Sequence, residues 1–112
     1  MIDDILKDSS IVTDIAGDYT LIKTKNQTIA FQLVKFGFQL NEHGSFEKKN
    51  LDQKDRLKTI KNLISINSIF SAGRDWSPEE LLDFYREQKL LNESYRVIYW
   101  KSQNNYQIRV VE

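Results

Sequence analysis

The chain has one histidine and no cysteine, which leaves few side chains for acid–base or nucleophilic chemistry. Without cysteine, disulfides, thiolate zinc sites and cysteine nucleophiles are all excluded. The single imidazole, His43, stands between Glu42 and Gly44 in a segment typical of an exposed turn. A histidine base needs a carboxylate to orient its ring and a nucleophile to deprotonate, and the spacing assigns neither. We therefore expect His43 to be a solvated turn residue.

Carboxylates offer a second route to chemistry. Asp14 and Asp18 flank a predicted hairpin, and Lys23 and Lys35 lie on the strands expected to follow. Carboxylates that converge at strand ends can hold a divalent metal for hydrolysis. The candidate strand at 31–35, however, lacks the acidic residue that restriction-type nucleases place two positions before the lysine. We interpret Asp18 as a turn residue and Asp14 as part of a solvated strand face, and rank a metal-dependent enzyme third among the possible functions.

Motifs for cofactors and nucleophiles are also missing from the sequence. The four glycines are isolated, so there is neither a phosphate loop nor a dinucleotide-binding motif. The Gly-x-Ser-x-Gly pattern of serine hydrolases does not occur. We therefore expect no cofactor, no resident metal and no enzymatic activity.

Two predicted helices carry charged stripes of opposite sign. Helical spacing groups an acidic set, Glu79, Asp83 and Glu87, and a basic set, Lys54, Lys58 and Lys61. The acidic stripe is either a solvated face or a docking surface for a basic partner. The basic stripe is either a solvated face or a contact with the phosphates of a nucleic acid. Zero net charge, with 16 basic and 16 acidic residues, disfavours the nucleic-acid alternative.

The last two predicted strands combine an aromatic side chain with arginines. Trp100 lies in the same predicted hairpin as Arg96 and Arg109. Exposed tryptophan, tyrosine and arginine side chains are enriched at the energetic centres of protein interfaces. These three residues, together with the acidic stripe, are the candidates for a protein interface.

Hydrophobic periodicity divides the chain into strands, then helices, then strands again. The predicted strands cover 11–16, 19–24, 28–40, 45–49, 95–101 and 106–111, and the predicted helices begin at 52 and 77 and end near 70 and 90. Between Leu33 and Val34 the apolar residues change from odd to even positions, which predicts a bulge in a long third strand. In the final hairpin we expect Tyr106 to share a face with Tyr99, and Trp100 to lie beside Gln107 or Arg109 on the other face.

The start of the second predicted helix has the strongest local signal. Ser77 is an expected N-cap, Pro78 suits the first helical position, and Glu80 completes a capping box. Trp76 and Leu81 have the spacing of a hydrophobic staple across that cap.

Composition limits the architecture. A chain of 112 residues with 40% hydrophobic side chains can build one core but not two. No apolar run approaches the length of a membrane span, and the acidic N-terminus lacks the features of a signal peptide. We therefore expect residues 1–112 to form one soluble, cytoplasmic domain that does not contact a membrane.

The sequence predicts an α+β fold: a bent antiparallel sheet of five to six strands with two helices on one face, in the order ββββααββ. By elimination, we expect a small non-catalytic protein-interaction module of the inhibitor, immunity or adaptor type. A nucleic-acid-associated accessory protein that uses the basic helix face is the alternative. The expected partner is another protein, and a homodimer through the aromatic sheet face remains open.

Overall fold

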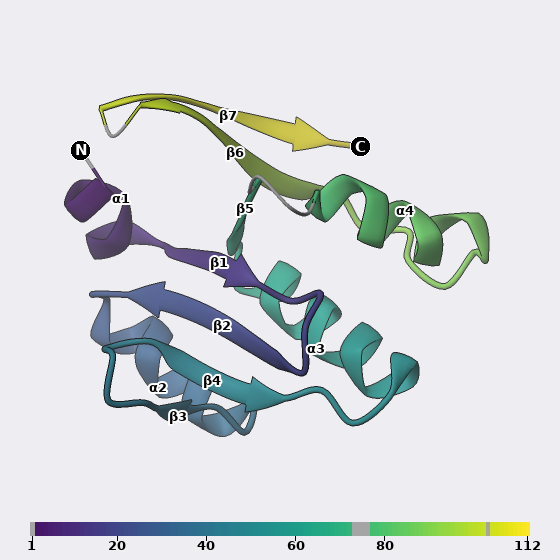
Figure 1. Cartoon of the computed structure of the whole chain (residues 1–112), viewed down its shortest axis with the longest axis horizontal. Coiled ribbons are helices and arrows are strands. Elements are labelled where there is room, and N and C mark those ends of the chain that lie inside the picture. The colour runs from purple at the N-terminus through teal and green to yellow at the C-terminus, as the bar shows by residue number, and fades with distance from the viewer. Residues whose placement is uncertain (1, 73–76, 103) are drawn as a thin grey trace.

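The computed structural model describes residues 2–72, 77–102 and 104–112, and Figure 1 shows how they are arranged. The helices are α1 (Ile2–Asp8), α2 (Gln27–Lys35), α3 (Gln53–Ser65) and α4 (Pro78–Glu87). The strands are β1 (Ser10–Asp14), β2 (Tyr19–Thr24), β3 (Gln39–Leu40), β4 (Phe46–Lys49), β5 (Ile69–Ser71), β6 (Tyr95–Ser102) and β7 (Asn105–Val111).

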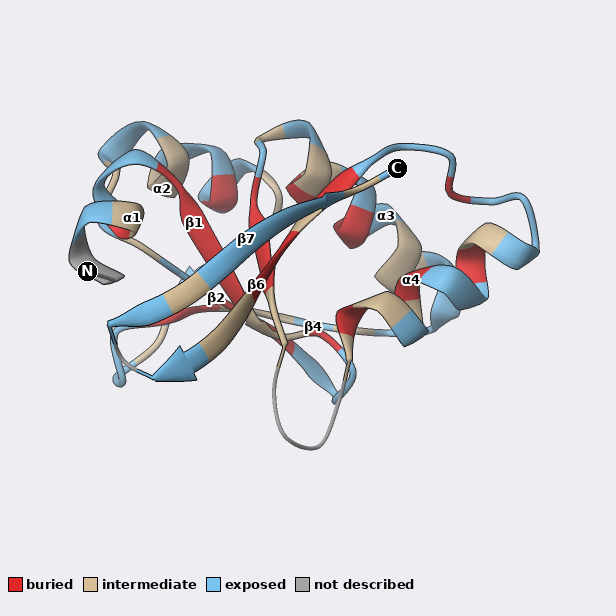
Figure 2. Cartoon of the chain, turned by 90° about the horizontal axis from the view of Figure 1, so that it is seen from above, coloured by how far each residue is buried: buried red, intermediate tan, exposed pale blue. Residues whose placement is uncertain are grey.

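All seven strands form one sheet in the order β3-β4-β2-β1-β5-β6-β7. The outer pairs are antiparallel, whereas β5 is parallel to both of its neighbours, β1 and β6. The α+β class is confirmed. The expected order ββββααββ, with two helices and an antiparallel sheet of five to six strands, is wrong because that order lacks α1, α2 and β5, and because β5 pairs in parallel. The sheet is strongly twisted, so that β6 and β7 cross over β1 at a steep angle in Figure 2.

One face of the sheet supports the main core. The strand register aligns a row of apolar side chains across five strands: Phe46, Ile22, Val12, Phe70 and Val97. Buried side chains of the three longer helices join the same cluster: Leu33, Ile60, Leu63, Leu82 and Tyr85. Helices α2, α3 and α4 therefore cover this first face, and Figure 2 shows buried segments in all three.

The second face has a smaller apolar centre. Ile11, Ile69 and Ile98 are each at most 2% exposed but do not belong to the main cluster. Ile11 pairs with Ile69, and Ile69 pairs in turn with Arg96. The row that begins with buried isoleucines in the middle of the sheet thus leads to an arginine on β6.

Residues 28–40 are not the predicted bulged strand. Residues 27–35 form helix α2, and Asn26 caps it by accepting a hydrogen bond from the Ile29 amide at 3.0 Å. Ile29, Leu33 and Phe36 pack into or against the core at helical spacing. The change from odd to even apolar positions does not mark a bulge. It results from the 3.6-residue period of this helix.

Gly37 ends α2 in a left-handed conformation with φ of 97°. The amide of Gly37 donates to the carbonyl of Val34, and the amide of Phe38 donates to the carbonyl of Leu33, each at 3.0 Å. This pair of bonds is the Schellman arrangement, and it is accompanied by burial of both Leu33 and Phe38.

Helix α3 ends at Ser65, five residues earlier than expected. Asn67 adopts a left-handed φ of 60°, and the Ser68 amide donates to the Leu63 carbonyl at 3.0 Å. An asparagine therefore ends this helix, because its side chain tolerates the left-handed region. The apolar residues Ile69 and Phe70, expected at the end of the helix, instead form the buried strand β5. The sequence also predicts Gly73 as the left-handed residue that stops this helix, but Gly73 lies outside the described residues.

The starts of α3 and α4 were located correctly. Asp52 caps α3 by accepting from the Asp55 amide at 2.7 Å. Ser77 is the N-cap residue of α4 and Pro78 follows it, but the Ser77 side chain makes no capping hydrogen bond, so the capping box is wrong. The staple involves Trp76, which lies outside the described residues.

The sequence predicts a type II′ turn at Gly17 and an edge strand at 45–49, and the structure differs from both predictions. Gly17 does not have positive φ, as a type II′ turn would need; instead the Asp14 carboxylate accepts from the Ala16 amide at 3.0 Å. Strand β4 is not an edge, because β3 pairs with its outer side.

Gly37→Ala tests the end of α2. A side chain at φ of 97° is strained whatever the available space, so we expect a loss of about 1 kcal/mol in the free energy of unfolding. Gly17→Ala is the matched control, because Gly17 is exposed, lacks positive φ and should change stability by less than about 0.5 kcal/mol. Urea denaturation of both variants measures the difference, and equal stabilities would contradict the assignment.

Candidate functional site

The register of the C-terminal hairpin decides which side chains share a surface. Trp100 pairs with Tyr106, Ile98 with Ile108, and Arg96 with Val110. A bulge between Trp100 and Ser102 shifts the ladder by one residue. The expectation that Trp100 lies beside Gln107 or Arg109 is therefore wrong, because one extra residue in β6 reverses which faces coincide.

This register creates an apolar strip on the second face, which we call the hairpin strip: Trp100, Tyr106, Ile108 and Val110. Val110 is 60% exposed and Ile108 is 37% exposed. Figure 2 shows that most of β7 is exposed. Three of its residues lie on β7, the last strand of the sheet, whose outer side is not paired with any strand of the described residues.

Trp100 is fixed within the fold. Its indole nitrogen donates to the Ser71 hydroxyl at 3.1 Å, and its ring lies 5.3 Å from that of Tyr106. Removal of Trp100 would therefore disturb the contact between β5 and β6 as well as the surface. Ile108 and Val110 are the cleaner probes of this strip.

Arg96 borders a pocket of about 240 Å³ at the end of the strip where β5 and β6 begin. The pocket is lined by the polar residues Asn67, Ser68 and Ser94, and by Val110 on the adjacent strand. One terminal nitrogen of Arg96 donates to the carbonyl of Asn67 and, at 3.1 Å, to the Ser9 hydroxyl. Its Nε is buried without a hydrogen-bond partner among the described residues. Burial lowers the pKa of the Arg96 guanidinium.

Two separate hydrogen bonds of serine hydroxyls join β1 to β5 at this end of the sheet. Ser10 and Ser68 share a hydrogen bond of 2.8 Å in the interior, and Ser9 donates to the Asn67 carbonyl at 3.2 Å. These bonds tie the beginning of β1 to the beginning of β5. They position the backbone against which the Arg96 side chain rests.

Arg109 lies on the opposite face from the hairpin strip. Its guanidinium carbon is 5.3 Å from the centre of the Tyr99 ring, and it donates to the Gln107 side chain at 3.2 Å. The structure thus brings Arg96 and Trp100 to one face and leaves Arg109 on the other.

The acidic stripe lies along α4. Asp83 and Glu87 are exposed, whereas Glu79 is half-buried. From the last turn of the same helix, Arg86 donates to the carbonyls of Glu93, Val111 and Glu112 at 2.9, 3.2 and 3.1 Å. These three bonds attach α4 to the end of β7.

The basic stripe is exposed on α3: Lys54, Lys58 and Lys61 all face solvent. Arg56, which is near them in sequence, is half-buried and donates to the Gly17 carbonyl at 3.0 Å. The three lysines are thus the cations of this helix that are available to a partner.

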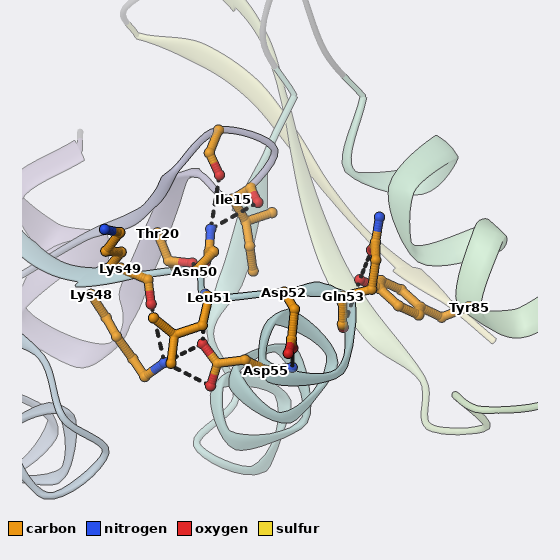
Figure 3. Close-up of polar contacts among 11 residues, drawn as sticks. Ile15, Thr20, Lys48, Lys49, Asn50, Leu51, Asp52, Gln53, Asp55 and Tyr85 are labelled. Carbon is orange, nitrogen blue, oxygen red and sulfur yellow. Dashed lines mark hydrogen bonds and ion pairs between the residues drawn. The ribbon is translucent and has the colours of Figure 1, made fainter.

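A dense group of polar contacts surrounds the start of α3 (Figure 3). Asn50 accepts from the Thr20 hydroxyl at 2.7 Å and donates to the Gly17 carbonyl at 3.0 Å. Lys48 and Asp55 form an ion pair of 3.1 Å. The hydrogen bond from the Leu51 amide lowers the pKa of the Asp55 carboxyl most, and the hydrogen bond and charge of Lys48 lower it further. Because these groups satisfy one another, we assign them to the junction of β4 and α3 and not to a binding site.

The remaining candidates for chemistry lie apart from one another. His43 is an exposed turn residue, as expected, with its Nε2 3.6 Å from the Glu42 carboxylate. Asp14 is occupied by the amides of its own turn, and Asp18 is exposed. Within the described parts of the chain, no three histidine, cysteine, aspartate or glutamate side chains gather as metal ligands.

No family model, no curated protein and no solved structure matches this chain. Among the helices of the described residues, none has the length and apolar character required to cross a bilayer.

Sequence reasoning missed the polar lining of the Arg96 pocket. Asn67, Ser68 and Ser94 precede strands, where such residues are common for local reasons. Nothing in their spacing indicates that β5 and β6 start side by side. Only the parallel pairing of the two strands brings these residues to Arg96.

Tyr95 and Tyr85 provide a paired test of this end of the core. The Tyr95 hydroxyl is buried without a hydrogen-bond partner in the described structure, whereas the Tyr85 hydroxyl donates to the Gln53 side chain at 2.6 Å. We expect Tyr95→Phe to change the free energy of unfolding by less than about 0.5 kcal/mol and Tyr85→Phe to cost about 1 kcal/mol in urea denaturation. Equal losses of unfolding free energy in the two variants would contradict the conclusion that only the Tyr85 hydroxyl is hydrogen-bonded.

Tyr95 also makes the free energy of unfolding depend on pH in alkaline solution. Burial, then the charge of Asp83, raises the pKa of Tyr95 to about 12. Its neutral form therefore stabilises the fold fully below the ordinary pKa near 10, and this contribution is lost as the pH rises towards 12. Tyr95→Phe should flatten that decline when urea denaturation is repeated at increasing pH.

Proposed function

We propose that this chain is a soluble, cytoplasmic, non-catalytic protein-interaction module that binds its partner through the hairpin strip. The observation that carries the proposal is the exposure of Ile108 and Val110, side by side on the edge strand of the sheet. Exposed apolar side chains next to a tryptophan, a tyrosine and an arginine have the composition of an interface core. An inhibitor, immunity or adaptor protein needs such a surface and no reaction centre.

The position of the strip adds a second means of attachment. Strand β7 spans Asn105–Val111 and ends the sheet, so its outer backbone groups can pair with an extended segment of a partner. Pairing would supply affinity through main-chain hydrogen bonds, while Ile108 and Val110 would supply the apolar contact. A second copy of this chain could pair in the same way.

The experiment compares two double variants of the same kind. Ile108→Ser/Val110→Ser removes the exposed apolar surface of β7, and Phe31→Ser/Val34→Ser removes exposed apolar surface from α2 on the other side of the sheet. A partner captured by the wild type is identified, prepared and titrated by calorimetry. We expect the β7 variant to weaken binding at least about tenfold and the α2 variant to leave it within about twofold.

The reverse ranking of the two variants would refute the hairpin strip as the binding surface. Light scattering of the wild type as a function of concentration detects self-association. A dimer lost only in the β7 variant would make the partner a second copy of this chain.

A nucleic-acid accessory function is the second candidate, and the exposed lysine stripe on α3 favours it. If Lys54, Lys58 and Lys61 contact phosphates, affinity for duplex DNA should fall with salt, with a logarithmic slope of about −0.9 for each contact. Reversal of all three lysines to glutamate should then abolish binding in gel-shift titrations at low salt. We expect instead that the wild type shows no micromolar binding to DNA or RNA.

A further inference from the structure

The pocket beside Arg96 contains a charged group that has no counter-ion of opposite sign among the described residues. Among the described residues, no carboxylate forms an ion pair with Arg96, and its contacts are the neutral oxygens of Asn67 and Ser9. By contrast, the cation Lys48 has a carboxylate partner at 3.1 Å. The cationic side chain of Arg96 is partly removed from water, and burial lowers its pKa. A bound anion would offset that cost.

The hydrogen-bonding groups around the pocket suit an oxyanion. Of the guanidinium nitrogens, Nη2 donates to the Asn67 carbonyl and the Ser9 hydroxyl, whereas Nη1 donates to no described residue and is the group available to a ligand. Nε also lacks a partner, but it is buried. Ser94 is exposed at the mouth of the pocket, and no hydrogen bond of its hydroxyl to the described residues is formed. Arginine binds carboxylates and phosphates through several parallel N–H groups, which makes it the preferred partner for such groups.

The size and the lining residues of the pocket indicate which kind of ligand it can hold. A volume of about 240 Å³ lies below the roughly 300–1,000 Å³ of sites for drug-sized molecules, so it suits a group the size of one side chain. Val110 and Ile64 add apolar walls that a hydrocarbon stem can contact. Val110 also belongs to the hairpin strip, so that a segment bound on β7 passes the mouth of the pocket.

We propose that the pocket beside Arg96 binds a carboxylate, and that in the complex this carboxylate is an acidic side chain of the partner protein bound on the hairpin strip. The second half rests on the proposed protein-binding function. The first half concerns the isolated chain and can be tested without a partner.

The first experiment uses acetate as the probe. The ¹⁵N-labelled chain is titrated with sodium acetate against sodium chloride at equal ionic strength, and the amide signals of Ser68 and Ser94 and the Nε–H signal of Arg96 are followed. We expect saturable shifts at these groups with acetate only. Identical or non-saturating shifts with the two salts would overturn the proposal. Tighter binding of inorganic phosphate than of acetate would overturn the choice of carboxylate.

Two pairs of variants assign the site. Arg96→Gln should raise the Kd for acetate about tenfold or more, and Arg109→Gln, on the other face of the same hairpin, should leave it within about twofold. Equal effects of the two substitutions would overturn the site.

Because Arg96 also supports Asn67, a second pair leaves the arginine in place. Val110→Asp puts a carboxylate on the cross-strand neighbour of Arg96 and should compete with acetate, whereas the neutral Val110→Asn should not. Unchanged acetate affinity in Val110→Asp would count against the pocket.

The partner complex separates the two halves of the proposal. Arg96→Gln should weaken the partner about tenfold, and that loss should disappear when the matching acidic residue of the partner is changed to its amide. Acetate binding combined with no effect of Arg96→Gln on the partner overturns the protein source and keeps the carboxylate site. Loss of the partner in the β7 double variant without acetate binding keeps the proposed function and overturns the pocket.

Discussion

The fold depends on three residues of backbone pairing in the middle of the sheet. Strand β5 joins β1 through Ile69 and Phe70, and joins β6 through the same residues and Ser71. Without it, the sheet would divide into a four-stranded part and the C-terminal hairpin. Ile69 and Phe70 are almost fully buried on opposite faces, so this short strand contributes to both apolar clusters. Its hydrogen bonds are shielded from water on both sides.

Strand β5 and the residue that precedes it also position the side chains of the candidate site. At the beginning of β5, the carbonyl of Asn67 accepts from Arg96. At its end, Ser71 accepts the indole hydrogen of Trp100. Arg96 and Trp100, which lie on the second face of the sheet, are thus held by a residue just before β5 and by the last residue of β5. A strand that holds the fold together therefore also arranges the surface that we assign to binding.

Local signals in the sequence were sufficient for the elements that depend on near neighbours. The C-terminal hairpin, the cap at Asp52, Pro78 at the start of α4 and the exposed turn at His43 all follow from residues a few positions apart. The helix at 27–35 was also encoded locally, by Asn26 and Gly37 at its two ends. It was missed because its apolar residues were read with a period of two.

Other features cannot be obtained from the sequence in this way. Ile69 and Phe70 follow an apolar helix without a glycine or proline, so nothing local separates the strand from the helix except Asn67. The face of Trp100 depends on one bulge in β6. The hydrogen bonds beside the Arg96 pocket join Ser9, Asn67 and Arg96, which only the parallel pairing brings together. Each of these features requires knowledge of distant pairing before local patterns can be interpreted.

The position of β5 in the chain has a consequence for the order of folding. The hydrogen bond between Ser10 and Ser68 joins residues 58 positions apart. Contacts at such a separation form late, because the entropy of closing the intervening loop is lost before they stabilise anything. Until Ile69 arrives, β1 is an edge strand that offers Ile11 and Val12 to any other extended chain. Docking of β5 therefore closes an edge at which another chain would otherwise pair with β1.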